Sequence, residues 1–177
     1  MPAASSPIPA PNPAASDSPL YVVKTSPIHG RGVFARRAIA PGDAIIEYTG
    51  ERITWYEANR RRDDNDPLNL TYFFTLNDGR VIDGGVNGNE ARYINHSCEP
   101  NCEAIEYDDG SVWIHALYGI ERGDELSYDY TLIYEGRHTP AIKRAFACHC
   151  GAPTCSGSML MSKRSARYRA NMRLMQK

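Results

Sequence analysis

Short apolar runs separated by turn residues dominate the first half of the chain. Segments 20–25 (LYVVKT), 32–35 (GVFA) and 44–50 (AIIEYTG) are rich in β-branched or aromatic residues, and the turn sequences PIHG and PGD stand between them. Runs of this length and composition are typical of β-strands. The pattern therefore predicts several short strands in this part of the chain.

Two further stretches alternate apolar and polar residues on either side of a turn ending in Asp-Gly. TYFFTL and RVIDG (71–84) flank the first turn, and CEAIEY and SVWIHAL (102–117) flank the second. Asp-Gly readily supplies the positive φ angles that hairpin turns need, so each stretch predicts a β-hairpin.

Helical character first appears in segment 54–64 (TWYEANRRRDD). There Thr54 is a candidate N-cap, and Glu57 three positions later completes the pattern of a capping box. No internal repeat is present, and the strands do not alternate with long helices, which argues against a doubly wound sheet. We expect a mostly β fold of the α+β class.

The last segment, 161–177, is also expected to be helical. It contains no acidic residue, and its basic residues are Lys163, Arg164, Arg167, Arg169, Arg173 and Lys177. We interpret it as a solvated basic helix docked by Tyr168, Met172 and Met175, with a nucleic-acid contact as the alternative.

Composition narrows the class of protein. The 177 residues suit one domain with a real core, and a net charge of −1 does not suggest an overall polycation. Segment 1–19, which is rich in Ala, Pro and Ser, is expected to be a disordered leader, because it has no apolar run long enough for a signal sequence or a membrane span. With no such signal, the five cysteines point to a reducing compartment, where clustered thiols more often bind metal than form disulfides.

Three of the cysteines have the spacing of a metal loop. Cys148-x-Cys150-x4-Cys155 suits a tetrahedral zinc ion but leaves one ligand to be found. Cys98, Cys102 and His149 are the candidates for it. The alternative is a set of reduced, buried thiols without metal.

Segment 91–102 (ARYINHSCEPNC) crowds Asn, His, Cys, Ser and Glu together, so a metal site, a nucleophile with its base, and a packed turn are all candidates. A nucleophilic Cys98 or Ser97 beside His96 is disfavoured, because the side chains of neighbouring residues rarely point at each other in a productive geometry. A dinucleotide-binding loop at Gly30-x-Gly32-x-x-Ala35 is rejected, because Pro41 and Gly42 would close any helix within about two turns.

Aromatic residues provide a further signal. Alternation along a strand places Tyr72 with Phe74, and Tyr128 with Tyr130, on common faces. A narrow aromatic slot with phenol groups at its tip suits a lysine side chain.

Five blocks, taken in order, resemble the SET-domain protein lysine methyltransferases, closest to trithorax-type members with a post-SET zinc loop. They are IHGRGVFA, IIEYTGE, ARYINHSCEPNC, ERGDELSYDY and CHCGAPTC, within a match spanning roughly Tyr21 to Leu160. The resemblance implies a β-clip fold of small sheets, in which the NHSC segment and the strand after it thread as a pseudoknot. It also implies a SET domain at 20–135, a post-SET zinc-binding loop at 144–160 and a basic tail at 161–177.

The resemblance also implies roles for individual residues. S-adenosylmethionine would bind on one face, to His29, Gly30, Arg31, Gly32, Tyr72, Arg92, Asn95, His96 and His149. Zinc would bind to Cys98, Cys148, Cys150 and Cys155. Tyr130 falls on the catalytic tyrosine, Tyr128 on the position that tunes how many methyl groups are added, and Phe74 on the wall of the lysine channel. With a second phenol at Tyr128, we predict mainly mono- or dimethylation.

The expected substrate is a lysine of a histone or histone-like protein. A SET-like module that binds peptide or nucleic acid without turnover is the alternative, and a methyltransferase of small molecules is disfavoured. We expect no membrane partner and an intracellular location: cytoplasmic if the source is bacterial, nuclear or chromatin-associated if it is eukaryotic or if the protein is host-directed.

Overall fold

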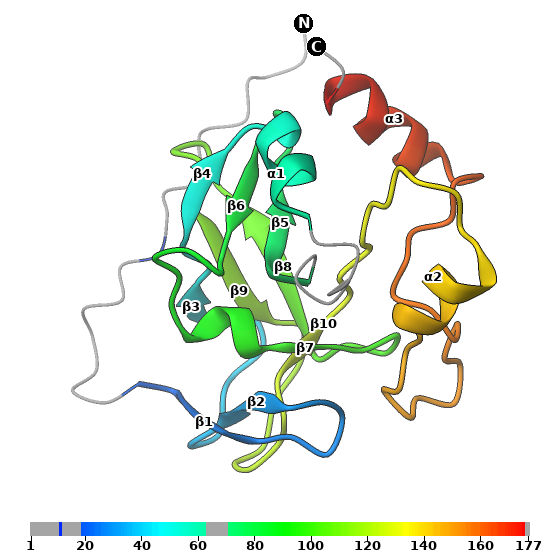
Figure 1. Ribbon diagram of the computed structural model, residues 1–177. Coiled ribbons are helices and arrows are strands. Elements are labelled where there is room, and N and C mark those ends of the chain that lie inside the picture. The colour runs from blue at the N-terminus through cyan, green and yellow to red at the C-terminus, as the bar shows by residue number, and fades with distance from the viewer. Residues whose placement is uncertain (1–10, 12–18, 63–70, 176–177) are drawn as a thin grey trace, which may run out of the picture.

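The computed structural model describes residues 11, 19–62 and 71–175, and four small sheets carry its strands (Figure 1). The first two sheets are β1 (Tyr21–Thr25) with β2 (Arg31–Ala35), and β3 (Ala44–Glu47) with β9 (Val112–Ala116) and β8 (Cys102–Glu106). The other two are β4 (Glu51–Ile53) with β6 (Val81–Asp83) and β5 (Phe73–Thr75), and β7 (Asn95–His96) with β10 (Ser127–Tyr128). The helices are α1 (Trp55–Arg61), η2 (Glu90–Tyr93), α2 (Pro140–Ala145) and α3 (Ala166–Met175).

Both predicted hairpins form. β5 pairs antiparallel with β6, β8 pairs antiparallel with β9, and Gly79 and Gly110 in their turns have φ of +86° and +80°. The strands expected at 20–25, 32–35 and 44–50 are β1, β2 and β3. Because Gly30 leads into a strand, the rejection of a dinucleotide-binding helix is confirmed. The predicted leader, 1–19, falls almost wholly outside the described residues.

Helix α1 begins at the predicted cap, but only half of the capping box forms. The Thr54 hydroxyl accepts the Glu57 N–H at 3.2 Å. The Glu57 carboxylate turns along the helix and binds Arg60 and Arg61 at 2.8 Å each. Two guanidinium groups within one turn attract this carboxylate more strongly than a single backbone N–H.

The main core packs the three-stranded sheet of β3, β9 and β8 against residues of β2, β6, η2 and β10. Its most buried side chains include Val33, Val112, Ile114 and Leu126, all at 0% exposure. A separate small cluster of Leu132, Tyr134 and Phe146 holds the chain that follows β10.

The short pair of β7 and β10 brings distant segments together at the centre of the molecule (Figure 1). It is parallel, with Ser127 opposite Asn95 and Tyr128 opposite His96. The segment after Ser127 is thereby laid beside the NHSC segment, as threading of the β-clip fold requires. The prediction of a mostly β fold with few helices is confirmed.

Beyond Tyr134 the chain forms few backbone ladders. Isolated bridges join Leu132 to Leu160 and Ala147 to Ser158, and α3 packs inward through Tyr168 and Met172. The prediction of a helix docked by Tyr168 and Met172 is thus confirmed. The Met175 side chain lies outside the described residues. No helix among the described residues combines the length and apolar character of a membrane span.

Candidate functional site

Two cavities meet at one tyrosine. The first, of about 500 Å³, lies among the loop between β1 and β2, η2, β7 and the cysteine-rich loop. The second, of about 400 Å³, lies among β5, β8, the segment around β10 and α3. Tyr130 and Thr71 line both, so Tyr130 separates and connects them. We call them the basic cavity and the aromatic cavity.

The basic cavity collects nearly all the residues that sequence predicted for cofactor binding. Its lining includes His29, Gly30, Arg31, Tyr72, Arg92, Asn95, His96 and His149. Gly32 is not part of this lining. A Cβ at Gly32 would collide with the Glu125 carboxylate, so a glycine there permits a close approach inside the protein.

Sequence reasoning gave no role to Tyr93, which organises the two arginines of this cavity. The Arg31 and Arg92 guanidinium groups lie 4.2 and 4.8 Å from the centre of the Tyr93 ring, and Arg92 donates to the Tyr93 hydroxyl at 2.8 Å. This hydrogen bond lowers the pKa of Tyr93. Cations held on a ring face are preorganised for an anionic group. Arg92 and Tyr93 are adjacent in the motif ARYINHSC. Their stacking with Arg31 could not be predicted, because it depends on the fold bringing β2 beside η2.

Asn95 uses its amide to shape the cavity wall. Its Nδ2 faces the carbonyl oxygens of His29 and Arg31 at 3.3 and 3.1 Å and the Glu125 carboxylate at 2.7 Å. Glu125 also accepts from the Ser26 hydroxyl at 2.7 Å. Glu125 had no predicted role. Its carboxylate holds the β1–β2 loop in place through Ser26 and Asn95.

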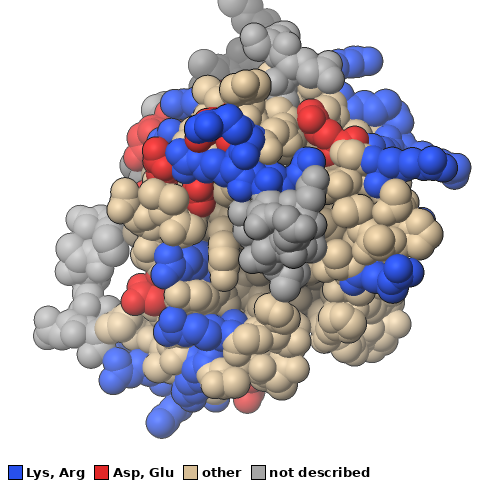
Figure 2. All heavy atoms as spheres, in the orientation of Figure 1, with Lys and Arg blue, Asp and Glu red and all other residues tan. Residues whose placement is uncertain are grey.

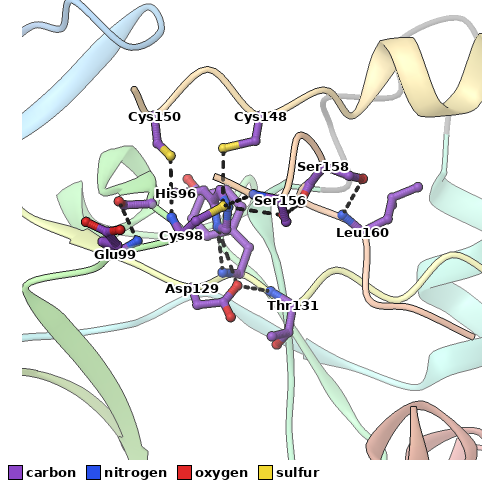
Figure 3. Close-up of polar contacts among 12 residues, drawn as sticks. His96, Cys98, Glu99, Asp129, Thr131, Cys148, Cys150, Ser156, Ser158 and Leu160 are labelled. Atoms are coloured by element: carbon purple, nitrogen blue, oxygen red, sulfur yellow. Dashed lines mark hydrogen bonds and ion pairs between the residues drawn. The ribbon is translucent and has the colours of Figure 1, made fainter. Parts of the chain in front are cut away.

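His96 lies between Tyr130 and the cysteines (Figure 3). The Tyr130 N–H donates to its Nδ1 at 3.1 Å, which is closer than Asp129 Oδ1 at 3.5 Å. Burial lowers the pKa of His96, so a neutral ring accepts at Nδ1 and carries its proton on Nε2. Nε2 lies 3.5 Å from Cys98 Sγ and is therefore a donor to that sulfur.

The aromatic cavity contains Phe74, Tyr128 and Tyr130 of the predicted slot, whereas Tyr72, which was expected on the same face as Phe74, lines the basic cavity. Phe74 lies 6.5 Å from Tyr128 and 5.5 Å from Tyr48, and Tyr128 lies 4.9 Å from Tyr130, all between ring centres. The cavity lining includes two carboxylates, Glu103 and Asp129, and no Lys or Arg among the described residues. Such a cavity favours a long cationic side chain with an apolar stem.

The two phenols of this slot remain protonated at neutral pH. Burial raises the pKa of Tyr128 and Tyr130 well above the ordinary value. The Tyr130 hydroxyl donates to the Ile94 carbonyl at 2.6 Å, which leaves its oxygen as an acceptor directed by that bond. Tyr128 is 6% exposed, and its hydroxyl forms no hydrogen bond with any described residue.

Four cysteines converge beside the basic cavity. The sulfur atoms of Cys98, Cys148, Cys150 and Cys155 all lie within 4.8 Å of one another. This donor set and spacing suit a tetrahedral metal site of the kind that zinc occupies. Cys98, which follows β7, is the fourth member of this cluster, and neither Cys102 nor His149 joins it.

Backbone N–H groups point at the sulfur atoms of Cys150 and Cys98, whereas burial raises the pKa of Cys148. Burial opposes ionisation of Cys150, but the Cys98 N–H points at its sulfur at 3.5 Å, and the pKa of Cys150 falls to about 6. The Ser156 N–H points at Cys98 Sγ at 3.4 Å. Cys102 is different: it is 1% exposed, and burial raises its pKa to about 12.

Comparison with known proteins shows the family of this chain. Residues 30–131 match the SET domain family. The chain is 39% identical over 137 residues to histone-lysine N-methyltransferase 2B of Homo sapiens, covering 75% of this chain and 5% of the relative. It is 38% identical over 134 residues to histone-lysine N-methyltransferase trithorax of Drosophila virilis, covering 73% of this chain and 3% of the relative.

A fungal relative has a more specific name. The histone-lysine N-methyltransferase, H3 lysine-4 specific, of Aspergillus oryzae is 39% identical over 137 residues, covering 75% of this chain and 11% of the relative. The chain thus spans only a small part of the relatives it matches. The match contains β2 to β10 and Tyr130. The chain belongs to the SET domain family, and it is similar to the trithorax-type members of that family.

Proposed function

We propose that this protein is a protein-lysine N-methyltransferase that uses S-adenosylmethionine. One observation carries the proposal: a basic cavity and an aromatic cavity meet at the buried Tyr130. A methyl donor in one cavity and a lysine side chain in the other would bring their reacting atoms together beside this residue. Such alignment supplies much of the acceleration of a two-substrate reaction.

The basic cavity has groups for each part of the donor. Arg31 and Arg92, stacked on Tyr93, suit the carboxylate of its amino-acid end. The loop between β1 and β2, which Asn95 and Glu125 hold, adds His29 and Gly30 to the lining beside Arg31. When bound, S-adenosylmethionine supplies an electrophilic methyl group on a positively charged sulfur.

The aromatic cavity prepares the amine. A lysine ammonium with a pKa near 10.4 must lose its proton before it accepts a methyl group. Burial among Phe74, Tyr128 and Tyr130, close to a second positive charge, lowers that pKa, so the proton leaves to water. Because Tyr130 stays protonated, it orients the amine through its oxygen and does not act as a strong base.

The four clustered cysteines are proposed to hold a structural zinc ion. Cys98 belongs to the β body, and the other three belong to the loop that carries His149 over the basic cavity. The metal would thereby close the cofactor pocket. Closed sites of four protein ligands are typical of structural zinc.

A histone or histone-like protein is the proposed substrate, since the relatives are named histone-lysine N-methyltransferases. The carboxylates of Glu103 and Asp129 at the aromatic cavity favour a lysine whose neighbours are also basic. A chromatin location follows from such a substrate in a eukaryotic cell.

The test measures transfer of a labelled methyl group from S-adenosylmethionine to histones and to a whole-cell lysate. Tyr130→Phe removes the hydroxyl and is expected to reduce transfer by about 10²-fold or more, the scale reported for removing one oriented polar group from an active site. Tyr118→Phe is the matched control, because Tyr118 is 54% exposed and lines neither cavity. Cofactor binding with no transfer to any substrate would instead favour a non-catalytic binding module.

A further inference from the structure

The charge of the molecule is divided sharply along the chain. From Gly136 to Lys177 there is no Asp or Glu, so all 21 acidic residues lie before this segment, although the whole chain has a net charge of only −1. The C-terminal segment is therefore strongly positive and the rest of the protein negative. A basic surface of this kind attracts a polyanion even when the whole protein is nearly neutral.

Six exposed cations of this segment gather on one side of the molecule, over α2 and α3, which Figure 2 shows at the right of the view. We call this surface the C-terminal basic face. Its residues are Arg137, Lys143, Arg144, Arg164, Arg169 and Arg173. None of them has an ion pair with any described residue.

Specific contacts make this face continuous. Lys163 Nζ donates to the carbonyl oxygens of Glu135 and Gly136 at 2.7 Å each, which joins the segment that carries Arg164 to the one that carries Arg137. The nearest carboxylate along the chain, that of Glu135, accepts from the Trp55 indole at 3.0 Å and so is already engaged.

The orientation of α3 turns its arginines to solvent. Tyr168 and Met172 pack inward, and Asn171 lines the aromatic cavity. At 3.6 residues per turn, Arg169 and Arg173 lie about 160° around the helix from Asn171. One side of α3 is therefore a wall of the substrate cavity, while the other is an outward row of guanidinium groups.

We propose that the C-terminal basic face binds the phosphate backbone of duplex nucleic acid. Arginine forks match phosphate oxygens, and five of the six cations are arginines. Single strands are usually gripped by exposed aromatic rings, but the aromatic residue of α3, Tyr168, is buried. Insertion into an anionic membrane needs an exposed apolar stripe, but Tyr168 and Met172 are turned inward and, among the described large apolar side chains of α3, Leu174 is the exposed one, at 39%.

The choice of duplex DNA as the partner rests on the proposed function, because a histone substrate in chromatin carries DNA wrapped around it. A tail entering the aromatic cavity would bring its DNA to the far side of α3. The face then acts as a second contact on the same substrate and raises its effective concentration at the active site.

The test uses the full-length protein without cofactor, so its result does not depend on methyl transfer. Anisotropy of a fluorescent 30-base-pair duplex is measured against salt. Six phosphate contacts predict that affinity falls about 10³-fold between about 50 and 200 mM salt. In the triple variant Arg164→Gln, Arg169→Gln, Arg173→Gln, the same change is expected to be only about 40-fold.

Matched variants separate charge from folding. Arg36→Gln, Arg37→Gln, Arg122→Gln removes three exposed arginines from the end of β2 and the loop before β10, and its salt dependence is expected to match that of the unmodified protein. Replacing Arg164, Arg169 and Arg173 by lysine keeps the charge and should keep the steep dependence. The thermal transition of each variant reports whether it is folded.

Three outcomes would overturn the proposal. They are no duplex binding at the lower salt concentration, equal losses in the two glutamine triples, and tighter binding to a single strand of the same length or to phosphatidylserine vesicles. If the duplex binds as expected but no methyl transfer occurs, the surface stands and the proposed function fails.

Discussion

The β body up to Tyr134 and the segment after it are held together by different forces. Among the described residues, the body has ten strands, an apolar core around the sheet of β3, β9 and β8, and residues such as Ile114 and Leu126 at 0% exposure. The segment after it has two isolated bridges, a few buried side chains such as Phe146, and three cysteines directed at Cys98 of the body. The body is stabilised by burial, whereas the segment depends on its attachment points.

Metal removal should separate the two regions most strongly. A structural zinc site contributes roughly 10 kcal/mol or more to folding of the part it holds. We expect a strong chelator to make the segment after Tyr134 sensitive to protease while the body keeps its thermal transition. S-adenosylmethionine affinity should fall by about 10-fold or more, as measured by calorimetry.

Cysteine variants provide the control for this experiment. Cys155→Ser should reproduce the effect of the chelator, because it removes one of the four converging sulfur atoms. Cys102→Ser makes the same chemical change at the buried cysteine outside the cluster, and its metal content should be unchanged. Unaltered cofactor affinity in metal-free protein would contradict the proposed closure of the pocket.

A pair of core substitutions should distinguish the regions next. Phe146→Ala and Ile114→Ala each remove a fully buried side chain, at a cost of about 3–5 and 2–5 kcal/mol respectively. Ile114→Ala is expected to lower the denaturant midpoint of the whole body. Phe146→Ala should leave that midpoint nearly unchanged and speed hydrogen exchange at the Leu132 and Met161 amides. Equal effects on the midpoint would mean that the two regions unfold together.

His96 lies in the body beside Cys98, the cysteine that the later segment contacts, and its two nitrogen atoms can be tested separately. His96→Asn places an amide near Nδ1, which accepts from Tyr130, while His96→Gln places one near Nε2, which faces Cys98. Loss of a hydrogen bond to a charged sulfur costs about 1.5–3 kcal/mol. We therefore expect His96→Asn to weaken metal binding and shift the thiolate absorption of cobalt-substituted protein, and His96→Gln to affect mainly methyl transfer. The opposite pattern would contradict the partners assigned to the two ring nitrogen atoms.

The smallest energetic effect is expected for a change that lies wholly in the body. Because the Tyr128 hydroxyl has no partner among the described residues, Tyr128→Phe should change the free energy of unfolding by less than about 1 kcal/mol. The vacated space beside Phe74 and Tyr130 should nevertheless admit a more methylated amine. Mass spectrometry of the product should show a higher methylation state. An unchanged product distribution would contradict the prediction that the Tyr128 hydroxyl limits the enzyme to mono- or dimethylation.

Local patterns were sufficient for the body but not for its contacts. The turns at Gly79 and Gly110 and the cap at Thr54 follow from a few adjacent residues, so the hairpins and α1 could be predicted. Glu57 was predicted to complete a capping box, yet it binds two arginines, because such a choice depends on which charges the fold brings near. The boundaries at 20–135, 144–160 and 161–177 stay predictions.

The site shows the same limit. The motifs around Asn95, Tyr130 and Cys148 located the right segments, because each motif carries its chemistry in consecutive residues. The ring of Tyr93 between two arginines and the bridge from Glu125 to Asn95 arise only when separate elements meet. Spacing alone likewise left the fourth cysteine undecided until the parallel pairing of β7 with β10 placed Cys98 beside the loop.

The wide separation of Cys98 from its partners imposes an order of events during synthesis. Cys148 and Cys155 follow Cys98 by 50 and 57 residues. At translation rates of about 5–20 residues per second, Cys98 leaves the ribosome several seconds before a complete set of ligands exists. The hairpins can form in that interval, because their contacts are local and fast. Metal binding by the four cysteines would therefore be a late step, because the set of ligands is complete only once Cys155 has been made.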